Sequence, residues 1–401
     1  MESKSFFKKA NFNFLCEFTF LLIFIFIILS KISVAFDTKA KAAYVFDELT
    51  DTVLLAKNPS ERLPPASMSK LMTLYMVFDA LKKERISLED EFRVSKRASQ
   101  KGGSKMFLKE GEIVSVENLI RGIIVQSGND ACIAIAESLS GTEEAFAHEM
   151  NLEAEKLGLQ NSFFSNSTGW PDPNHYMSPY DLVFLARTIQ EKFPNYYQYF
   201  SETEFTWDKI IQKNRNPLLG KGLGADGLKT GHTSEAGYGI VISAKRGNRR
   251  ITFVISGLSS SKERAREAEK ISDWAFRDFK AIKIIDKEEE ITKIATWLGK
   301  KNYVGLNSSE DIYVLTRHGE KPNFEAKILV DSYMLAPFSA GEEAPAKLSI
   351  IGPNPNQNQN SIEVNFPLYA METVDRGDYF TRFKAASVIL VQKFLDLINI
   401  D

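Results

Sequence analysis

The sequence predicts an α+β fold, and the order of the element patterns along the chain supports this prediction. Strand-like apolar runs come first, helical patterns fill the middle, and strand-like runs return at residues 238–244. That order predicts an antiparallel sheet assembled from distant segments, with a helical cluster packed against it. Near Ile284 the sequence changes to short β-type runs separated by turn clusters, which predicts a second, small all-β domain.

The first elements are a hairpin and a helix. Residues 42–46 and 52–56 are apolar or alternating runs around a polar turn, which is the pattern of two paired strands. Pro64-Pro65 then precedes apolar residues at helical spacing between Met68 and Leu81, and proline ahead of a periodic stretch marks a helix start. Ser67 is therefore expected at or near the first turn of a buried helix.

The middle of the chain is predicted to be helical and the following part to form strands. Helical patterns cover residues 116–124, 130–139, 142–157 and 178–191, strand-like runs cover residues 238–244 and 251–258, and a charged helical pattern covers residues 261–280. The core is therefore expected to join segments that are far apart in the sequence.

Residues 1–35 have the pattern of an export signal. Three lysines precede an apolar run at residues 20–29, and Ser33-Val-Ala35 offers small residues at a cleavage site. An uncleaved N-terminal anchor is the alternative.

The remaining chain is predicted to have three parts: a domain at residues 36–283, an all-β domain at residues 284–376 and a C-terminal helix at residues 377–401. In the last part, apolar residues share one helical face but charged residues interrupt them, so the segment cannot comfortably span a bilayer. We expect an amphipathic helix that lies on the membrane surface, with a helix that packs on a domain as the alternative.

Charge and cysteine content narrow the class of function. Without residues 1–35 the chain has 46 basic and 50 acidic residues, a formal charge of −4, which does not favour nucleic acid as a partner. Cys132 is the one cysteine left, so no internal disulfide can form. We expect Cys132 to be a small buried hydrophobe rather than a reactive thiol.

Three short motifs together point to acyl transfer. Ser67-Met-Ser-Lys70, Ser127-Gly-Asn129 and Lys229-Thr-Gly231 supply a serine nucleophile, an amine to deprotonate it, a second hydroxyl and a cation for a carboxylate. Each motif alone is weak, because S-x-x-K recurs at Ser5 and Ser259 and the others are common turn sequences. Ser67 alone could be an ordinary helix N-cap and Lys70 a solvated lysine.

The spacing of the first motif suits this chemistry. Residues three apart on a helix have Cβ atoms about 5–6 Å apart, so the Lys70 amine could reach the Ser67 hydroxyl. Lysine accepts a proton only if desolvation or a neighbouring cation lowers its pKa, and Lys229 could be that cation. Backbone N–H groups at the helix start and on the strand that follows Lys229 could hold an oxyanion.

Other patterns carry less weight. Gly222-Leu-Gly-Ala-Asp-Gly227 matches a dinucleotide motif, but no clear strand precedes it and no helix follows it. His148-Glu149 begins a zinc-peptidase motif whose second histidine is replaced by Leu152. We expect no catalytic metal and no organic cofactor.

The motifs and their surroundings resemble one family. Pro65-Ala-Ser-Met-Ser-Lys-Leu-Met-Thr73, Gln126-Ser-Gly-Asn-Asp-Ala-Cys132 and Asp226-Gly-Leu-Lys-Thr-Gly-His-Thr233 are similar to the D-alanyl-D-alanine carboxypeptidases of the penicillin-binding protein 5/6 type. The segments at residues 103–108 and 214–219 are similar to its connecting segments. The resemblance implies a β-lactamase/transpeptidase-like domain, a small β-rich domain and a membrane-associated tail at the periplasmic face of the inner membrane.

The resemblance also implies roles for individual residues. Ser67 would form the acyl-enzyme on peptidoglycan pentapeptide, Lys70 would accept its proton and Ser127 would relay it. The backbone N–H of His232 would contribute to the oxyanion hole, and Arg264 would bind the terminal carboxylate. The full set of residues expected to bind substrate is Asn129, Lys229, Thr230, Gly231, His232 and Arg264. Arg266 is the rival to Arg264. β-Lactam antibiotics would acylate Ser67 as inhibitors.

Alternatives to a carboxypeptidase remain open at this point. A β-lactamase usually has a positioned glutamate, and none occurs between Asn161 and Ser178, where the polar residues include Asn166, Asp172, Asn174 and His175. A peptidoglycan endopeptidase and a non-catalytic cell-wall-binding protein are the other candidates.

Overall fold

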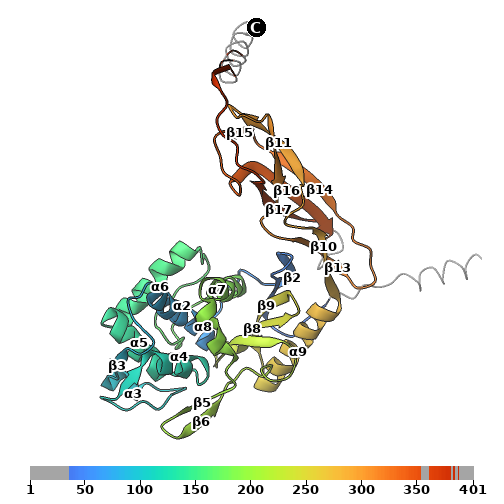
Figure 1. Cartoon of the computed structure of the whole chain (residues 1–401). Helices are drawn as coiled ribbons and strands as arrows, with labels where there is room; N and C mark the ends of the chain where they lie inside the picture. Colours follow the sequence, from blue (N-terminus) through green and yellow to red (C-terminus); the bar gives the residue numbers. More distant parts are fainter. Residues whose placement is uncertain (1–35, 354–360, 381–382, 384–386, 388–401) are drawn as a thin grey trace, which may run out of the picture. The chain divides into compact units, whose positions relative to one another are not determined.

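A five-stranded antiparallel sheet and a helical cluster form the part of the molecule that carries the three motifs (Figure 1). The structure is a computed structural model that describes residues 36–353, 361–380, 383 and 387. The predicted export signal and most of the predicted C-terminal helix lie outside these residues.

The sheet has the order β2-β1-β9-β8-β7, and neighbouring strands are antiparallel. Its strands are β1 (Ala42–Asp47), β2 (Thr52–Lys57), β7 (Ala225–Thr233), β8 (Gly237–Arg246) and β9 (Arg249–Leu258). The predicted hairpin and the two late strands are confirmed. Lys229-Thr-Gly231 lies inside edge strand β7, whereas the sequence alone favoured a turn ahead of the strand at residues 238–244.

The helical cluster agrees with the predicted patterns. Its helices are η1 (Ala66–Ser69), α2 (Lys70–Lys82), α3 (Lys96–Gln100), α4 (Val116–Ile124), α5 (Asn129–Ser140), α6 (Glu143–Leu157), α7 (Pro179–Lys192), α8 (Pro194–Tyr197) and η2 (Gln198–Ser201). Two short antiparallel strand pairs accompany them, β3 (Glu91–Arg93) with β4 (Ile113–Ser115) and β5 (Glu204–Trp207) with β6 (Ile210–Lys213). Ser115, Thr142 and Ser178 cap α4, α6 and α7 by accepting a backbone N–H.

Helix α2 is the centre of the cluster. Every residue of α2 except Asp79 and Lys82 is buried, so the helix is apolar nearly all round rather than amphipathic. Helix α7 packs against β1 and β9, and α9 (Ser261–Arg277) packs against β8 and β9. The start of α2 is therefore held inside the core, and this rigidity matters for the residues placed there.

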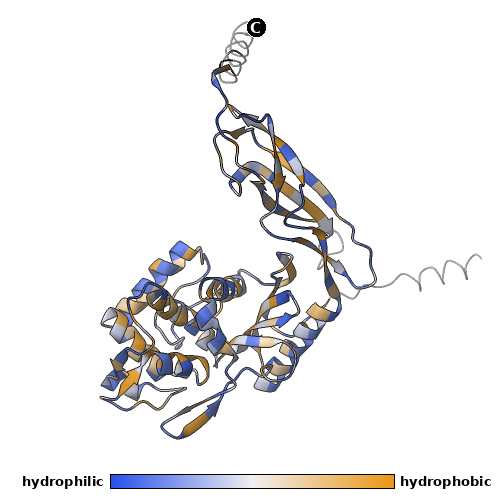
Figure 2. Ribbon diagram, in the orientation of Figure 1, coloured by the Kyte–Doolittle hydropathy of each residue, from blue (hydrophilic) through white to orange (hydrophobic). Residues whose placement is uncertain are grey.

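The β-rich part of the chain has a core of its own. Its large sheet has the order β14-β16-β17-β12-β11-β15, and β10 (Phe279–Ile285) pairs with β13 (Ile312–Arg317). The strands of the large sheet are β11 (Thr292–Trp297), β12 (Tyr303–Asn307), β14 (Glu325–Val330), β15 (Met334–Leu335), β16 (Glu343–Pro353) and β17 (Ser361–Ala370). Apolar and polar residues alternate along several of these strands (Figure 2), as expected for strands with one buried face.

The junction between α9 and the β-rich part differs from the prediction. The helix ends at Arg277, and Lys280 lies in strand β10, so the predicted helix at residues 261–280 is three residues too long. The Phe279 side chain is buried against Trp274, with ring centroids 5.2 Å apart, and its carbonyl accepts from Arg249. No glycine or proline separates the two elements, so the sequence carried no stop signal there.

Candidate active site

Ser67 and Lys70 meet at the start of the buried helix. Ser67 lies in the single turn η1, Lys70 begins α2, and Lys70 Nζ is 2.9 Å from Ser67 Oγ. Ser67 is partly exposed, whereas Lys70 is fully buried. Ser67 caps neither helix, and Lys70 is not solvated, so the ordinary interpretation of this pair is wrong.

The Lys70 amine is surrounded by oxygen atoms. Besides Ser67 Oγ, it contacts Asn129 Oδ1 at 2.7 Å and the Thr168 carbonyl oxygen. The Asn129 and Thr168 oxygens can only accept hydrogen bonds, so the two N–H groups of a neutral Lys70 amine donate to them. The remaining lone pair then faces the Ser67 hydroxyl, which is the arrangement that a proton acceptor needs.

Electrostatics favour that neutral form. Burial lowers the pKa of Lys70 from 10.5 to about 8; the Cys132 thiol opposes this shift and the Arg215 guanidinium adds to it. Cys132 is itself fully buried and its pKa is raised to about 12, mainly by burial. The prediction that Cys132 is buried is therefore confirmed.

Ser127 and Lys229 form a second pair in the same site. Lys229 Nζ donates to Ser127 Oγ at 2.9 Å, and both residues are buried. Ser127 has a left-handed backbone (φ 60°) in the turn before α5. Burial, and next the charge of the Lys70 amine, hold the pKa of Lys229 well below its ordinary value.

Asn129 joins the first pair to the loop beside it. Its Oδ1 accepts from Lys70, and its Nδ2 donates to the Gly102 carbonyl at 2.8 Å. The next residue, Asp130, is fully buried and accepts from the backbone N–H groups of Met106 and Leu108. The segment at residues 103–108 is therefore fastened to the start of α5.

Strand β7 approaches η1 closely at Gly231. A Cβ at this position would lie 2.8 Å from the Pro65 carbonyl oxygen and 3.2 Å from Ala66 Cβ, so only glycine fits. Thr230 is buried beside it, while His232 is exposed and stacks on Tyr238 with ring centroids 3.8 Å apart. This close approach brings the third motif to the first.

Arg264 and Arg266 have different surroundings. Arg264 lies over the Tyr238 ring at 5.8 Å, its charge lowers the pKa of Lys229, and its buried Nε has no hydrogen-bond partner among the described residues. Arg266 is exposed and lies near Glu263. Of the two rivals, Arg264 is the one with an unused donor near Lys229.

The comparisons with known proteins agree with this geometry. Residues 30–260 match the D-alanyl-D-alanine carboxypeptidase family, described as Peptidase S11, and residues 279–376 match the penicillin-binding protein 5 C-terminal domain. The chain belongs to the D-alanyl-D-alanine carboxypeptidase family. It is thus a serine-type D-Ala-D-Ala carboxypeptidase with the penicillin-binding protein fold. The second match begins at residue 279, where β10 begins.

Relatives of this carboxypeptidase come from several bacteria. The chain is 37% identical to D-alanyl-D-alanine carboxypeptidase DacD of Salmonella typhimurium over 351 residues, covering 86% of this chain and 88% of that protein. It is 35% identical to DacF of Bacillus subtilis, with 86% and 88% covered. The crystal structure of penicillin binding protein 5 from Haemophilus influenzae superposes with a TM-score of 0.75 at 34% identity, covering 85% of this chain and 98% of that one.

Three contributors to the carboxypeptidase site had no role in the sequence analysis. Arg215 donates to Ser104 Oγ at 2.6 Å, and its charge lowers the pKa of both Lys70 and Lys229. Thr168 contributes only a backbone oxygen, and Glu143 reaches the segment around Thr168 from α6. Arg215 lies in a segment singled out by its resemblance to the family, but no sequence pattern signals the other two.

Proposed function

We propose that the carboxypeptidase reaction runs through an acyl-enzyme on Ser67, with Lys70 as the proton acceptor. The observation that carries this proposal is the 2.9 Å contact between Lys70 Nζ and Ser67 Oγ at a fully buried amine. The lowered pKa of Lys70 makes its neutral fraction near neutral pH far larger than that of an ordinary lysine.

The steps balance as follows. The Lys70 lone pair takes the Ser67 proton while Oγ attacks the carbonyl carbon of the penultimate D-alanine, and the backbone N–H groups of Ser67 and His232 stabilise the oxyanion. The C–N bond then breaks, and the leaving D-alanine nitrogen receives a proton through Ser127. Water hydrolyses the Ser67 ester and restores the free enzyme.

Cationic residues bind the terminal carboxylate in this proposal. Lys229 and Thr230 lie on the edge strand beside the nucleophile, and Arg264 has a buried donor that no other described residue binds. A substrate carboxylate next to Lys229 favours its protonated form and so offsets the effect of burial on its pKa. A β-lactam presents a similar carbonyl and carboxylate, and it therefore acylates the same serine.

The proposal includes export and attachment to the membrane surface. Residues 1–35 act as the export signal, and residues 377–401 form an amphipathic helix on the membrane. No helix in the described part of the chain has both the length and the apolar character to cross a bilayer. Deletion of residues 381–401 is expected to release the protein into the soluble fraction, and unchanged membrane retention would contradict this part.

Labelling with a fluorescent penicillin tests the nucleophile. The Ser67→Ala variant is expected to lose all label. Ser259→Ala changes an exposed serine of another S-x-x-K pattern, just before α9, and is expected to label like the wild type. Equal labelling of wild type and Ser67→Ala rejects the assignment. Release of D-alanine from pentapeptide monomers, with little cleavage of cross-linked dimers or turnover of a chromogenic β-lactam, separates the carboxypeptidase from its rivals.

A further inference from the structure

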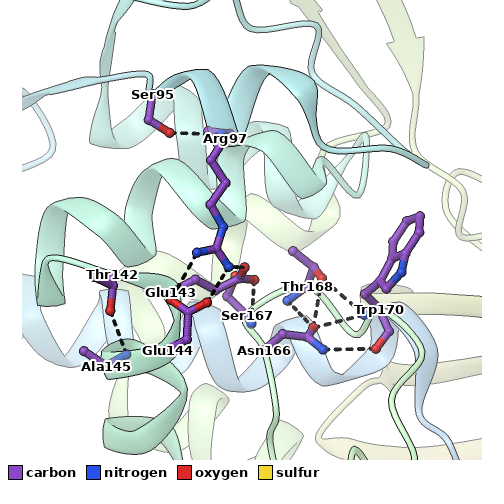
Figure 3. Close-up of polar contacts among 11 residues, drawn as sticks. Ser95, Arg97, Thr142, Glu143, Glu144, Ala145, Asn166, Ser167, Thr168 and Trp170 are labelled. Atoms are coloured by element: carbon purple, nitrogen blue, oxygen red, sulfur yellow. Dashed lines mark hydrogen bonds and ion pairs between the residues drawn. The ribbon is translucent and has the colours of Figure 1, made fainter.

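A buried carboxylate outside the three motifs is bound to the segment beside Lys70 (Figure 3). Glu143, the first residue of α6, is 3% exposed. Its Oε1 accepts from Ser167 Oγ at 2.8 Å and from the Ser167 backbone N–H at 3.2 Å, and its Oε2 pairs with Arg97 Nη2 at 2.8 Å. Both carboxylate oxygens of Glu143 thus have partners inside the protein.

The segment bound by Glu143 also contacts helix α2, which begins at Lys70. The Ser167 carbonyl accepts from Thr73 Oγ1 at 2.6 Å, and the next carbonyl, that of Thr168, accepts from Lys70 Nζ. Thr73 lies one turn after Lys70 on α2, and all four residues are buried. The pair Ser167-Thr168 is therefore held by Glu143 on one side and by α2 on the other.

The rest of this segment is fastened locally. Asn166 Oδ1 accepts from the backbone N–H groups of Thr168 and Trp170 and from Thr168 Oγ1 (Figure 3). Gly169 has φ 75°, and a Cβ there would clash with the Ala66 carbonyl. These bonds shape the turn but do not connect it to α6. Glu143 provides a side-chain link from α6 to the turn at Ser167, and Asn151 of α6 binds the Phe164 backbone earlier in the chain.

We infer that Glu143 is a positioning residue for the acylation step: it holds Ser167-Thr168 where the Thr168 carbonyl binds one N–H of Lys70 and so directs the amine lone pair at Ser67. Glu143 contacts none of the reacting atoms. The inference rests on the proposed role of Lys70 as proton acceptor. A lysine amine has a long flexible stem, and loss of one of its two acceptors leaves its lone pair without a defined direction.

Two single substitutions separate the reach of the side chain from its charge. Glu143→Gln keeps the length and an oxygen for Ser167 but removes the charge, and we expect its acylation rate constant to stay within about threefold of the wild type. Glu143→Asp keeps the charge and the Arg97 partner but is one methylene shorter. We expect it to lose about 10- to 100-fold, the range that a small misplacement of reacting groups produces.

The measurements are the first-order acylation rate constant and the dissociation constant of the preceding complex with a penicillin. Glu143→Asp is expected to lower the rate constant and leave the dissociation constant unchanged, because Lys229 and Arg264 are untouched. Thr142→Ala is the matched control: it removes the cap of the same helix, where Thr142 Oγ1 accepts from Ala145 at 3.0 Å, but leaves the Glu143 contacts intact. It is expected to lower the melting temperature and to acylate at the wild-type rate.

The outcomes are separable. Wild-type acylation by Glu143→Asp overturns the inference, and so does the reverse order, with Glu143→Gln slow and Glu143→Asp fast, since charge and not reach would then matter. An equal loss in Thr142→Ala also overturns it, because helix stability alone would explain the effect. If Ser67→Ala or Lys70→Arg still acylates normally, the proposed function fails instead.

Discussion

Lys229 Nζ donates to Ser127 Oγ at 2.9 Å, although the two residues are 102 positions apart in the sequence. The bond occupies a lone pair of the Ser127 oxygen, so the hydroxyl proton points elsewhere and can be given to a leaving nitrogen. The residue that would bind the substrate carboxylate thus also orients the residue that would relay the proton. In the proposed reaction, substrate binding and proton transfer are therefore coupled at this contact.

The acylation rate is expected to rise with pH and level off above about pH 8. Lys70 accepts a proton only as the neutral amine, and burial lowers its pKa to about 8. The measurement is the second-order rate constant for acylation by a penicillin as a function of pH. The rise of the rate constant with pH should persist in Lys229→Arg. A rise with its midpoint near 10.5, the ordinary pKa of lysine, would contradict the assignment of Lys70 as the proton acceptor.

The lowered pKa of Lys70 also predicts that the free energy of unfolding depends on pH. Between about pH 8 and the ordinary pKa of 10.5, the unfolded chain holds a proton on Lys70 that the folded protein has lost. The free energy of unfolding therefore rises with pH across this window, and Lys229 acts in the same direction because its pKa is also lowered. Urea unfolding at several pH values is the measurement, and in Lys70→Met we expect a smaller slope.

Gly231→Ala is expected to slow acylation at least tenfold and to lower stability by about 1–3 kcal/mol, the range for overpacking. The added methyl group would meet the Pro65 carbonyl oxygen at 2.8 Å and would push β7 away from η1. Gly352→Ala is the control, because a Cβ there has only ordinary contacts, the nearest at 3.6 Å. Normal acylation by Gly231→Ala would show that the site tolerates a wider gap between the two elements.

Arg264→Ala is expected to raise KM for pentapeptide about tenfold or more, which corresponds to a hydrogen bond to a charged group worth about 1.5–3 kcal/mol. Its Nε is buried and has no partner among the residues that the structure describes, and we propose that the substrate carboxylate is that partner. Arg266→Ala, at the exposed neighbouring position, should leave both kcat and KM unchanged. If Arg266→Ala raised KM and Arg264→Ala did not, the order of these two rivals would be reversed.

Arg249→Ala is expected to lower the free energy of unfolding by about 3–5 kcal/mol, because it leaves a buried charge unpaired. Arg249 Nε lies 2.5 Å from the carboxylate of Asp47, which is fully buried, and Arg249 also donates to the Phe279 carbonyl. Denaturant unfolding measures the effect. Arg277→Ala, which breaks an exposed pair with Asp278, should change stability little.

Local patterns predicted most of the elements of the carboxypeptidase domain. The spacing of apolar residues located α4, α6 and α7, since this pattern repeats within one or two turns of a helix. The contact of Ser67 with Lys70 was predictable for the same reason, because it spans three positions of one helical segment. One exception is the end of α9, where a strand follows the helix without a turn residue. Another is β7, because the sequence analysis predicted no strand over residues 225–233.

By itself the sequence predicted Ser67 as the nucleophile, Lys70 as its base and their contact at the start of a helix, because these predictions depend on short-range geometry. Only the tertiary structure decided what surrounds them: the Thr168 carbonyl on Lys70, the Glu143 carboxylate on Ser167 and the different surroundings of Arg264 and Arg266. A backbone oxygen leaves no residue type to recognise, and burial depends on how distant segments pack. Those contacts, and the lowered pKa values that follow from burial, exist only in the folded chain.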